Sequence, residues 1–256
     1  MSVDAGVRLP FWTRLANPGQ FLALSRPWIV PLALLTGVLF AAGLYFAFFA
    51  SPPDYQMGDT VRIMYVHVPN AWLSQFVYAT MAISALGSLV WRHPMADVSM
   101  KAAAPLGATF TALALVTGGL WGYPTWGTFW EWDGRMTSTL VLLFIYLGII
   151  ALWRAFDDPL RAGRVVAVFT LVGAINIPVV KFSVDWWSSL HQRASVFTPE
   201  GPRMPPSLLI PLLIMALAFT ALFTTLHLIS MHTEIRRRRL ASLSRQRAGA
   251  LEGARA

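Results

Sequence analysis

Residues 207–230 have the sequence SLLIPLLIMALAFTALFTTLHLIS, which contains no Asp, Glu, Lys or Arg. A helix of about 20 apolar residues crosses the hydrocarbon core of a membrane, so this stretch predicts a transmembrane helix. Five similar stretches precede it: Trp28–Ala50, Ala71–Trp91, Ala102–Trp121, Thr137–Trp153 and Val165–Val180. The sequence therefore predicts an all-α integral membrane protein with six transmembrane helices.

Few residues of the chain carry a charge. Charged residues make up 12% of the 256 residues, whereas a soluble domain carries about 25%, and the mean hydropathy is +0.56. Both values agree with a membrane protein. The chain has no cysteine, which excludes disulfides, thiolate metal ligands and the Cys-x-x-Cys-His attachment of c-type haem.

The basic residues indicate how the six helices are oriented. The segments rich in Lys and Arg are residues 1–27, 92–101, 154–164 and 236–256. With six spans these segments share one side of the membrane, and cytoplasmic loops carry the excess of Lys and Arg. We therefore expect both termini in the cytoplasm. The net charge of +8 then follows from topology and does not indicate nucleic-acid binding.

The same topology divides the chain into three parts. Residues 28–235 form the six-helix membrane domain, and residues 1–27 form a cytoplasmic or interfacial segment interrupted by Pro18. Residues 236–256 are basic and polar, a composition typical of a disordered cytoplasmic tail. Within the membrane domain, Pro178 predicts that the fifth helix ends early or bends at its outer end.

The connection between the third and fourth helices, on the side opposite the termini, contains Trp126-Gly127-Thr128-Phe129-Trp130-Glu131-Trp132-Asp133, and Trp121 precedes it. Membrane interfaces attract single tryptophans such as Trp28. Three tryptophans within seven residues, interleaved with glycine and carboxylates, need another explanation. If this run is helical, Trp126 and Trp130 share a face. Because indole faces offer a large contact area, we expect a surface for a large planar ligand; the alternative is a loop that lies flat on the membrane.

Two histidines lie in the other connections on the same side. His67 follows Tyr65-Val66, and His191 follows Trp186-Trp187-Ser188-Ser189-Leu190. Imidazole is a common ligand of haem iron, and both histidines have aromatic neighbours. Together with the Trp-rich run they suggest haem, although an isolated loop histidine is usually solvated or hydrogen-bonded.

Three further polar residues have candidate roles. Arg62 and Arg135 could bind haem propionates through bidentate hydrogen bonds, or could pair with lipid headgroups or with Asp133. The Asp133 carboxylate could accept a hydrogen bond from an imidazole or cap the fourth helix. Asn176, inside a short span, is expected to bond across helices.

These motifs resemble those of the haem exporter protein C family of the bacterial cytochrome c maturation system. The resemblance extends over about residues 25–235 and includes Tyr65-Val66-His67-Val68-Pro69, the Trp-rich run and the segment Trp186–Gln192. The family pattern has tryptophan where this chain has Phe129. An aromatic ring is retained at that position, but an indole N–H donor is lost.

The resemblance implies a haem-handling protein that is not itself an enzyme. It implies that His67 and His191 are the axial ligands of haem b, bound non-covalently and in transit. The Trp-rich motif would contact haem and the haem chaperone CcmE, and the arginines would lie near the propionates. The residues implied in haem binding besides the histidines are Trp121, Trp126, Trp130, Trp132, Asp133, Arg62 and Arg135.

The resemblance also implies partners and a location. The chain would assemble with the ABC transporter subunits CcmA and CcmB and the small membrane protein CcmD in the bacterial inner membrane, in contact with membrane lipid. Two other functions remain open on the residues alone. A transmembrane haem transporter would need a polar path through the bundle, and an electron-transfer b-type cytochrome would need histidines paired within helices.

Overall fold

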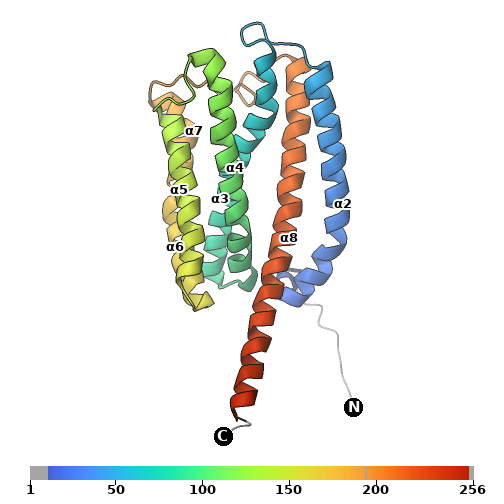
Figure 1. Cartoon of the computed structure of the whole chain (residues 1–256), viewed down its shortest axis with the longest axis vertical. Coiled ribbons are helices and arrows are strands. Elements are labelled where there is room, and N and C mark those ends of the chain that lie inside the picture. The colour runs from blue at the N-terminus through green and yellow to red at the C-terminus, as the bar shows by residue number, and fades with distance from the viewer. Residues whose placement is uncertain (1–10, 194, 254–256) are drawn as a thin grey trace.

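The structure of the chain, a computed structural model, describes residues 11–193 and 195–253. The described residues form a bundle of helices, in which the longest connection joins α7 to α8 (Figure 1). The helices of the first half are α1 Phe11–Ala16, α2 Pro18–Tyr45, α3 Met64–Trp91 and α4 Pro94–Trp126. Those of the second half are α5 Gly134–Ala155, α6 Pro159–Gly173, α7 Asn176–Trp186 and α8 Pro206–Gly253. A π-helical turn, Phe46–Ala50, extends α2, and a 3-10 helix, Asp59–Ile63, leads into α3.

Six helical stretches of the described chain are long and apolar enough to cross a membrane. They are Pro18–Ala50, Asp59–Trp91, Pro94–Trp126, Gly134–Ala155, Pro159–Trp186 and Pro206–Leu251. The predicted fold class, a helical membrane protein with six spans, is confirmed. The start of α1 and the end of α8 lie at one end of the bundle, here called the terminal end. The connections after α2, α4 and α7 lie at the opposite end, here called the loop end (Figure 1).

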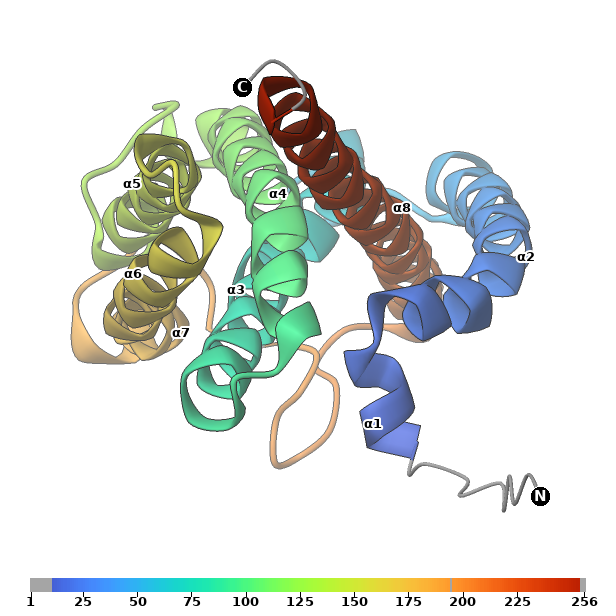
Figure 2. The ribbon, with the colours of Figure 1, turned by 90° about the horizontal axis from the view of Figure 1, so that it is seen from below.

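Viewed from the terminal end, the bundle has a central pair, α3 and α4, between two flanking groups (Figure 2). The helices α5, α6 and α7 lie on one side, and α8 followed by α2 lies on the other. Buried tyrosines join the central pair to the first group. The Tyr146 hydroxyl donates to the carbonyl of Ser74 (2.8 Å) and the Tyr78 hydroxyl to that of Thr170 (2.9 Å). A Cβ at Gly107 would lie 2.2 Å from the Tyr146 ring, so this close approach requires glycine.

The fifth span bends as the position of Pro178 predicted. The α6 helix ends at Gly173, a turn follows, and α7 begins at Asn176. A proline inside a helix lacks its N–H, and its ring clashes with the carbonyl four residues earlier, which is that of Ala174. Asn176 at this bend donates from Nδ2 to the carbonyl of Ser138 on α5 (2.9 Å), which confirms the predicted bond across helices.

Two helix boundaries differ from the predictions, and each difference changes the element to which a candidate site residue belongs. The α3 helix begins at Met64 rather than Ala71, so the prediction that His67 lies in a loop was wrong. Pro69, in the second turn of α3, costs the helix only one hydrogen bond. The α4 helix continues to Trp126 and ends because Gly127 adopts the left-handed conformation with φ 75°. Trp130 lies beyond this end, so it does not share a helical face with Trp126.

Both terminal segments contain helices within the described residues. In the N-terminal part, α1 ends at Ala16, and Asn17 caps α2 by accepting from the backbone N–H of Gly19 (2.9 Å). At the other terminus, α8 continues to Gly253, whereas composition predicted disorder. Residues 240–251 are largely Ala, Leu, Arg and Gln, which have high helix propensity, and they are exposed.

Candidate functional site

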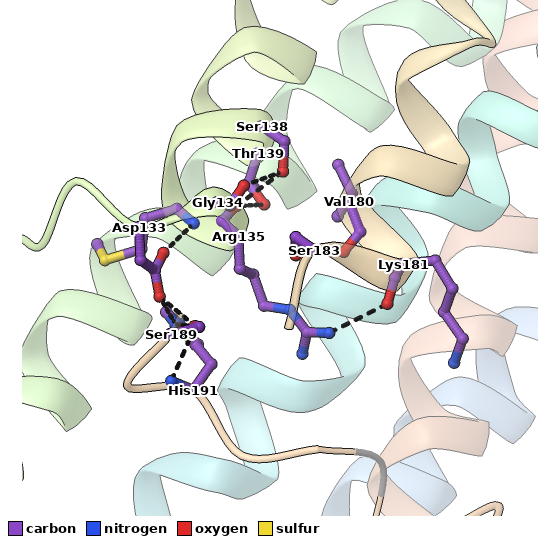
Figure 3. A network of polar contacts seen from close by, with 11 residues as sticks. Asp133, Gly134, Arg135, Ser138, Thr139, Val180, Lys181, Ser183, Ser189 and His191 are labelled. Atoms are coloured by element: carbon purple, nitrogen blue, oxygen red, sulfur yellow. Dashed lines mark hydrogen bonds and ion pairs between the residues drawn. The ribbon is translucent and has the colours of Figure 1, made fainter. Parts of the chain in front are cut away.

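The candidate site at the loop end centres on Asp133. This residue is the N-cap of α5, and its Oδ1 accepts from the backbone N–H of Met136 (2.8 Å). Its Oδ2 accepts from the Ser189 hydroxyl (2.5 Å) and faces Nδ1 of His191 (2.6 Å) (Figure 3). The side chain is almost fully buried, with 7% of the residue exposed. Asp133 therefore has both roles that the sequence suggested, because one carboxylate caps a helix and holds an imidazole.

The charges of this pair follow from their surroundings. Burial tends to raise the pKa of Asp133, but hydrogen bonds from Ser189, Met136 and His191 together bring that pKa below its ordinary value. Burial lowers the pKa of His191, and this effect exceeds the opposing attraction of the Asp133 carboxylate. At neutral pH the pair is therefore an ionised carboxylate and a neutral imidazole. The carboxylate fixes the proton on Nδ1, so the lone pair is on Nε2, the state in which histidine binds a metal.

His67 is held on α3 against α4. Its Nδ1 lies 3.2 Å from the Thr117 hydroxyl, which itself donates to the carbonyl of Leu113. Because the Thr117 proton is used in this way, its oxygen accepts from Nδ1 of His67, and Nε2 is again the unprotonated nitrogen. A Cβ at Gly118 would lie 2.9 Å from Cε1 of the imidazole. Glycine at this position therefore makes room for the ring.

Each histidine packs against a tryptophan of the α4 end. The rings of Trp121 and His67 meet edge to face with centroids 5.6 Å apart. Those of Trp126 and His191 meet in the same way at 4.8 Å. Trp121 and Trp126, at the end of one helix, thus contact an imidazole from α3 and another from the connection after α7.

The rest of the Trp-rich run forms an irregular loop over this end. Within it, Trp130 and Trp132 pack edge to face at 5.3 Å, while Phe129 stacks on Tyr123 at 4.1 Å with an interplanar angle of 10°. The Trp132 residue is 72% exposed and Phe129 is 55% exposed. The loop therefore exposes aromatic surface outward, while the indoles that contact the histidines belong to α4.

The two arginines lie in different surroundings. Arg135, in the first turn of α5, donates from Nη2 to the carbonyl of Lys181 (3.3 Å) beside Asp133 (Figure 3). Arg62 instead forms an ion pair with Asp59 (3.0 Å) and donates to the carbonyl of Phe48 at the end of α2. Arg135 therefore shares the surroundings of the histidines, whereas the contacts of Arg62 go to the turn before α3 and to the end of α2.

Several buried donors in this region have no hydrogen-bond partner among the described residues. They include the indole Nε1 of Trp121, the indole Nε1 of Trp130 and Nε of Arg135. Buried donors usually have partners, so these groups fit a ligand that supplies acceptors, such as carboxylates. Two Nε2 lone pairs, indole faces and a guanidinium are together a chemically suitable set for haem.

The sequence predicted the role of Asp133 but did not reveal two other polar residues that orient the imidazoles, Ser189 and Thr117. Ser189 donates to Asp133, and its Oγ accepts from the backbone N–H of His191 (3.1 Å). The position of Ser189 two residues before His191 is a weak local signal for this turn. Thr117 could not be identified because its contact with His67 joins residues 50 positions apart.

The fold and this site define a class of protein: a polytopic helical membrane protein with two tryptophan-packed imidazoles at one end. Residues 11–246 match the sequence profile of the family described as "CcmC: Heme exporter protein C". Because this match includes most of the chain, the protein belongs to the Heme exporter protein C family.

Named relatives agree with the profile. The Heme exporter protein C of Bradyrhizobium diazoefficiens is 61% identical over 234 residues, which are 91% of this chain and 89% of the relative. That of Escherichia coli K12 is 45% identical over 223 residues, 87% of this chain and 89% of the relative. That of Paracoccus denitrificans is 42% identical over 232 residues, 89% and 95% of the two chains.

Proposed function

We propose that this chain handles haem in cytochrome c biogenesis, without enzymatic activity of its own, by binding haem at the loop end. His67 and His191 would be the iron ligands. The observation that carries the proposal is the hydrogen-bonded group of Asp133, Ser189 and His191, packed against Trp126. A carboxylate that fixes the tautomer of an imidazole is the usual support of a metal-binding histidine.

The remaining residues of the site would hold the porphyrin. Trp121 and Trp126 would provide apolar surface next to the histidines, with Trp130 and Trp132 covering the ligand from the loop. Arg135 would pair with a propionate through its partly unused guanidinium. Arg62 is a weaker candidate because Asp59 already neutralises it, and it would need to exchange partners to bind a propionate.

We further propose that the loop end faces the periplasm of a bacterial inner membrane and presents haem b, non-covalently bound, to the chaperone CcmE. The exposed rings of Trp132 and Phe129 are suitable contacts for such a partner, since aromatic residues are enriched in interfaces. Assembly with CcmA, CcmB and CcmD follows from family membership, and any ATP hydrolysis would belong to those partners.

Two observations favour this function over its rivals. A b-type cytochrome of the expected kind would hold both histidines in helices, and only His67 lies in one. A transporter would need a polar path, and the side-chain amide of Asn176 in the fifth span is already bonded to the carbonyl of Ser138.

Absorption spectra of the purified protein in detergent, oxidised and reduced, test the iron ligands. We expect a low-spin haem spectrum in the wild type that is lost or shifted in His67→Ala and in His191→Ala. His93→Ala is the matched control, because His93 caps α4 at the terminal end and its loss leaves the loop end intact. An unchanged spectrum and unchanged haem content in both loop-end variants would refute the ligand assignment.

A further inference from the structure

A second buried carboxylate lies at the terminal end, far from the histidine site along the helices. Glu234 of α8 is 7% exposed. It accepts from Nζ of Lys101 on α4 (3.1 Å), from Nε and Nη2 of Arg237 (2.8 and 3.0 Å) and from Nε of Arg238 (2.8 Å). One negative charge therefore holds three positive charges, so the cluster carries an excess of two.

The cations keep donors that Glu234 does not use. A lysine ammonium has three N–H donors and a guanidinium has five, whereas each of these side chains donates only once or twice to the carboxylate. In Arg238, Nη2 is buried and has no hydrogen-bond partner among the described residues. Lys101 is also fixed by the Trp153 ring, whose centroid lies 5.3 Å from Nζ. The cluster therefore has a net positive charge and holds unused N–H donors in fixed positions.

Two of these cations, Lys101 and Arg237, line a cavity between α4 and α8. Its volume is about 280 Å³, and its walls include Lys101, Ser230, Thr233, Glu234 and Arg237. The volume equals that of about nine liquid waters at roughly 30 Å³ each. Thr233 and Arg237 are exposed at its rim, so a molecule outside the bundle can reach it. The walls therefore combine the cations of Lys101 and Arg237 with two hydroxyl groups, and with the Glu234 carboxylate their net charge is +1.

We propose that this cavity binds the phosphate headgroup of an anionic phospholipid. Lys101 lies about two turns after the start of α4 and contacts Trp153, which is two residues before the end of α5. This depth corresponds to the headgroup region, where Trp side chains also gather. Basic pockets between transmembrane helices bind lipid headgroups, and the acyl chains would lie along the apolar flank of α4 and α8.

Native mass spectrometry of the full chain in detergent tests this site, with phosphatidylglycerol or phosphatidylcholine added. We expect one phosphatidylglycerol to be retained in preference to phosphatidylcholine. The double variant Lys101→Gln/Arg237→Gln should bind phosphatidylglycerol roughly ten- to thirtyfold more weakly, since each cation near the surface contributes a severalfold attraction. Arg245→Gln/Arg247→Gln removes the same charge from the exposed part of α8 and should retain wild-type binding.

A second variant separates loss of the site from loss of folding. Ser230→Leu keeps all four charged groups and fills the cavity, so it should lose phosphatidylglycerol while its thermal midpoint in detergent stays that of the wild type. The proposal would be overturned if Lys101→Gln/Arg237→Gln and Arg245→Gln/Arg247→Gln weakened phosphatidylglycerol binding equally. That result would indicate general attraction of the lipid to a basic helix. Displacement of the lipid by millimolar inorganic phosphate, or equal retention of both lipids, would also overturn it.

Discussion

The two ends of the bundle each contain a buried carboxylate, and their partners differ. Asp133 at the loop end binds a hydroxyl, a backbone N–H and a neutral imidazole. Glu234 at the terminal end binds one lysine and two arginines. The two residues are equally buried, at 7% exposed. The difference teaches that burial alone does not define the role of a carboxylate, because its partners determine whether it orients a ligand or joins helices.

The comparison predicts opposite effects for the two residues. Loss of Glu234 should weaken the bundle and spare the histidine site, since its ion pair with Lys101 joins α4 to α8. Loss of the Asp133 charge should spare the bundle and weaken the histidine site. Measuring both stability and haem binding on the same variants therefore tests whether the two carboxylates have different roles.

The largest effect is expected for Glu234→Ala. Removing one partner of a buried charge cluster leaves the others uncompensated, although Arg237 is largely exposed and can be hydrated. The free energy of unfolding should fall by about 2–4 kcal/mol, visible as a lower thermal midpoint in detergent, while haem titrates as in the wild type. Glu200→Ala is the matched control, since its ion pair with Arg203 is exposed, and its midpoint should not change. A Glu234→Ala midpoint equal to that of the wild type would contradict the structural role of the cluster.

The next effect is expected for Asp133→Asn. Asparagine is as good an N-cap as aspartate, so the start of α5 and the thermal midpoint should be retained. The imidazole of His191 loses its charged acceptor, and haem affinity measured by absorption titration should fall roughly 10- to 100-fold. Asp185→Asn removes an exposed carboxylate from the same end, where it pairs with Arg193 (3.5 Å), and should bind haem normally. Equal affinity in the two variants would show that Asp133 does not support the ligand.

The sequence predicted most contacts of the buried carboxylate at the loop end and few of those at the terminal end. The roles of Asp133 were predictable because its partners are either three residues away, at Met136, or within an aromatic motif that also contains His191. The cluster around Glu234 was not, because Lys101 lies on another helix and hydropathy patterns carry no information about which helices pair. The sequence therefore identified Arg237 and Arg238 only as part of the basic C-terminal segment.

The fold itself was largely predictable, with errors concentrated at helix ends. Hydropathy identified all six spans because each must be apolar over about 20 residues. It could not identify where helices end outside the membrane, since residues there need not be apolar. His67 was therefore assigned to a loop, although α3 already includes it. The ion pair of Arg62 with Asp59 was not predicted, because the sequence did not reveal the 3-10 helix that brings the two side chains together.

A smaller effect concerns the titration of His191 in the haem-free protein. Its pKa is held below the ordinary value of 6.5 by burial, so the folded protein binds fewer protons than the unfolded chain just below pH 6.5. This site therefore contributes less to stability as the pH falls through that range. In Asp133→Asn the opposing carboxylate is gone, and the pKa of His191 should move lower still. NMR of ¹⁵N-histidine-labelled protein, assigned with His191→Ala, measures both values, and an upward shift in Asp133→Asn would contradict the electrostatics described here.

The smallest effect is expected where this chain departs from the family pattern. Phe129→Trp restores the tryptophan of that pattern, yet the Phe129 ring is half exposed and stacked on Tyr123, away from the imidazole that Trp126 contacts. Haem affinity should change by less than about threefold, because no contact with His191 is gained. The reverse exchange three residues earlier, Trp126→Phe, reduces the aromatic surface packed on His191. It should weaken haem binding by more than Phe129→Trp changes it. If Phe129→Trp has the larger effect, the outward-facing part of the loop takes part in binding, and haem extends beyond the two histidine–tryptophan pairs.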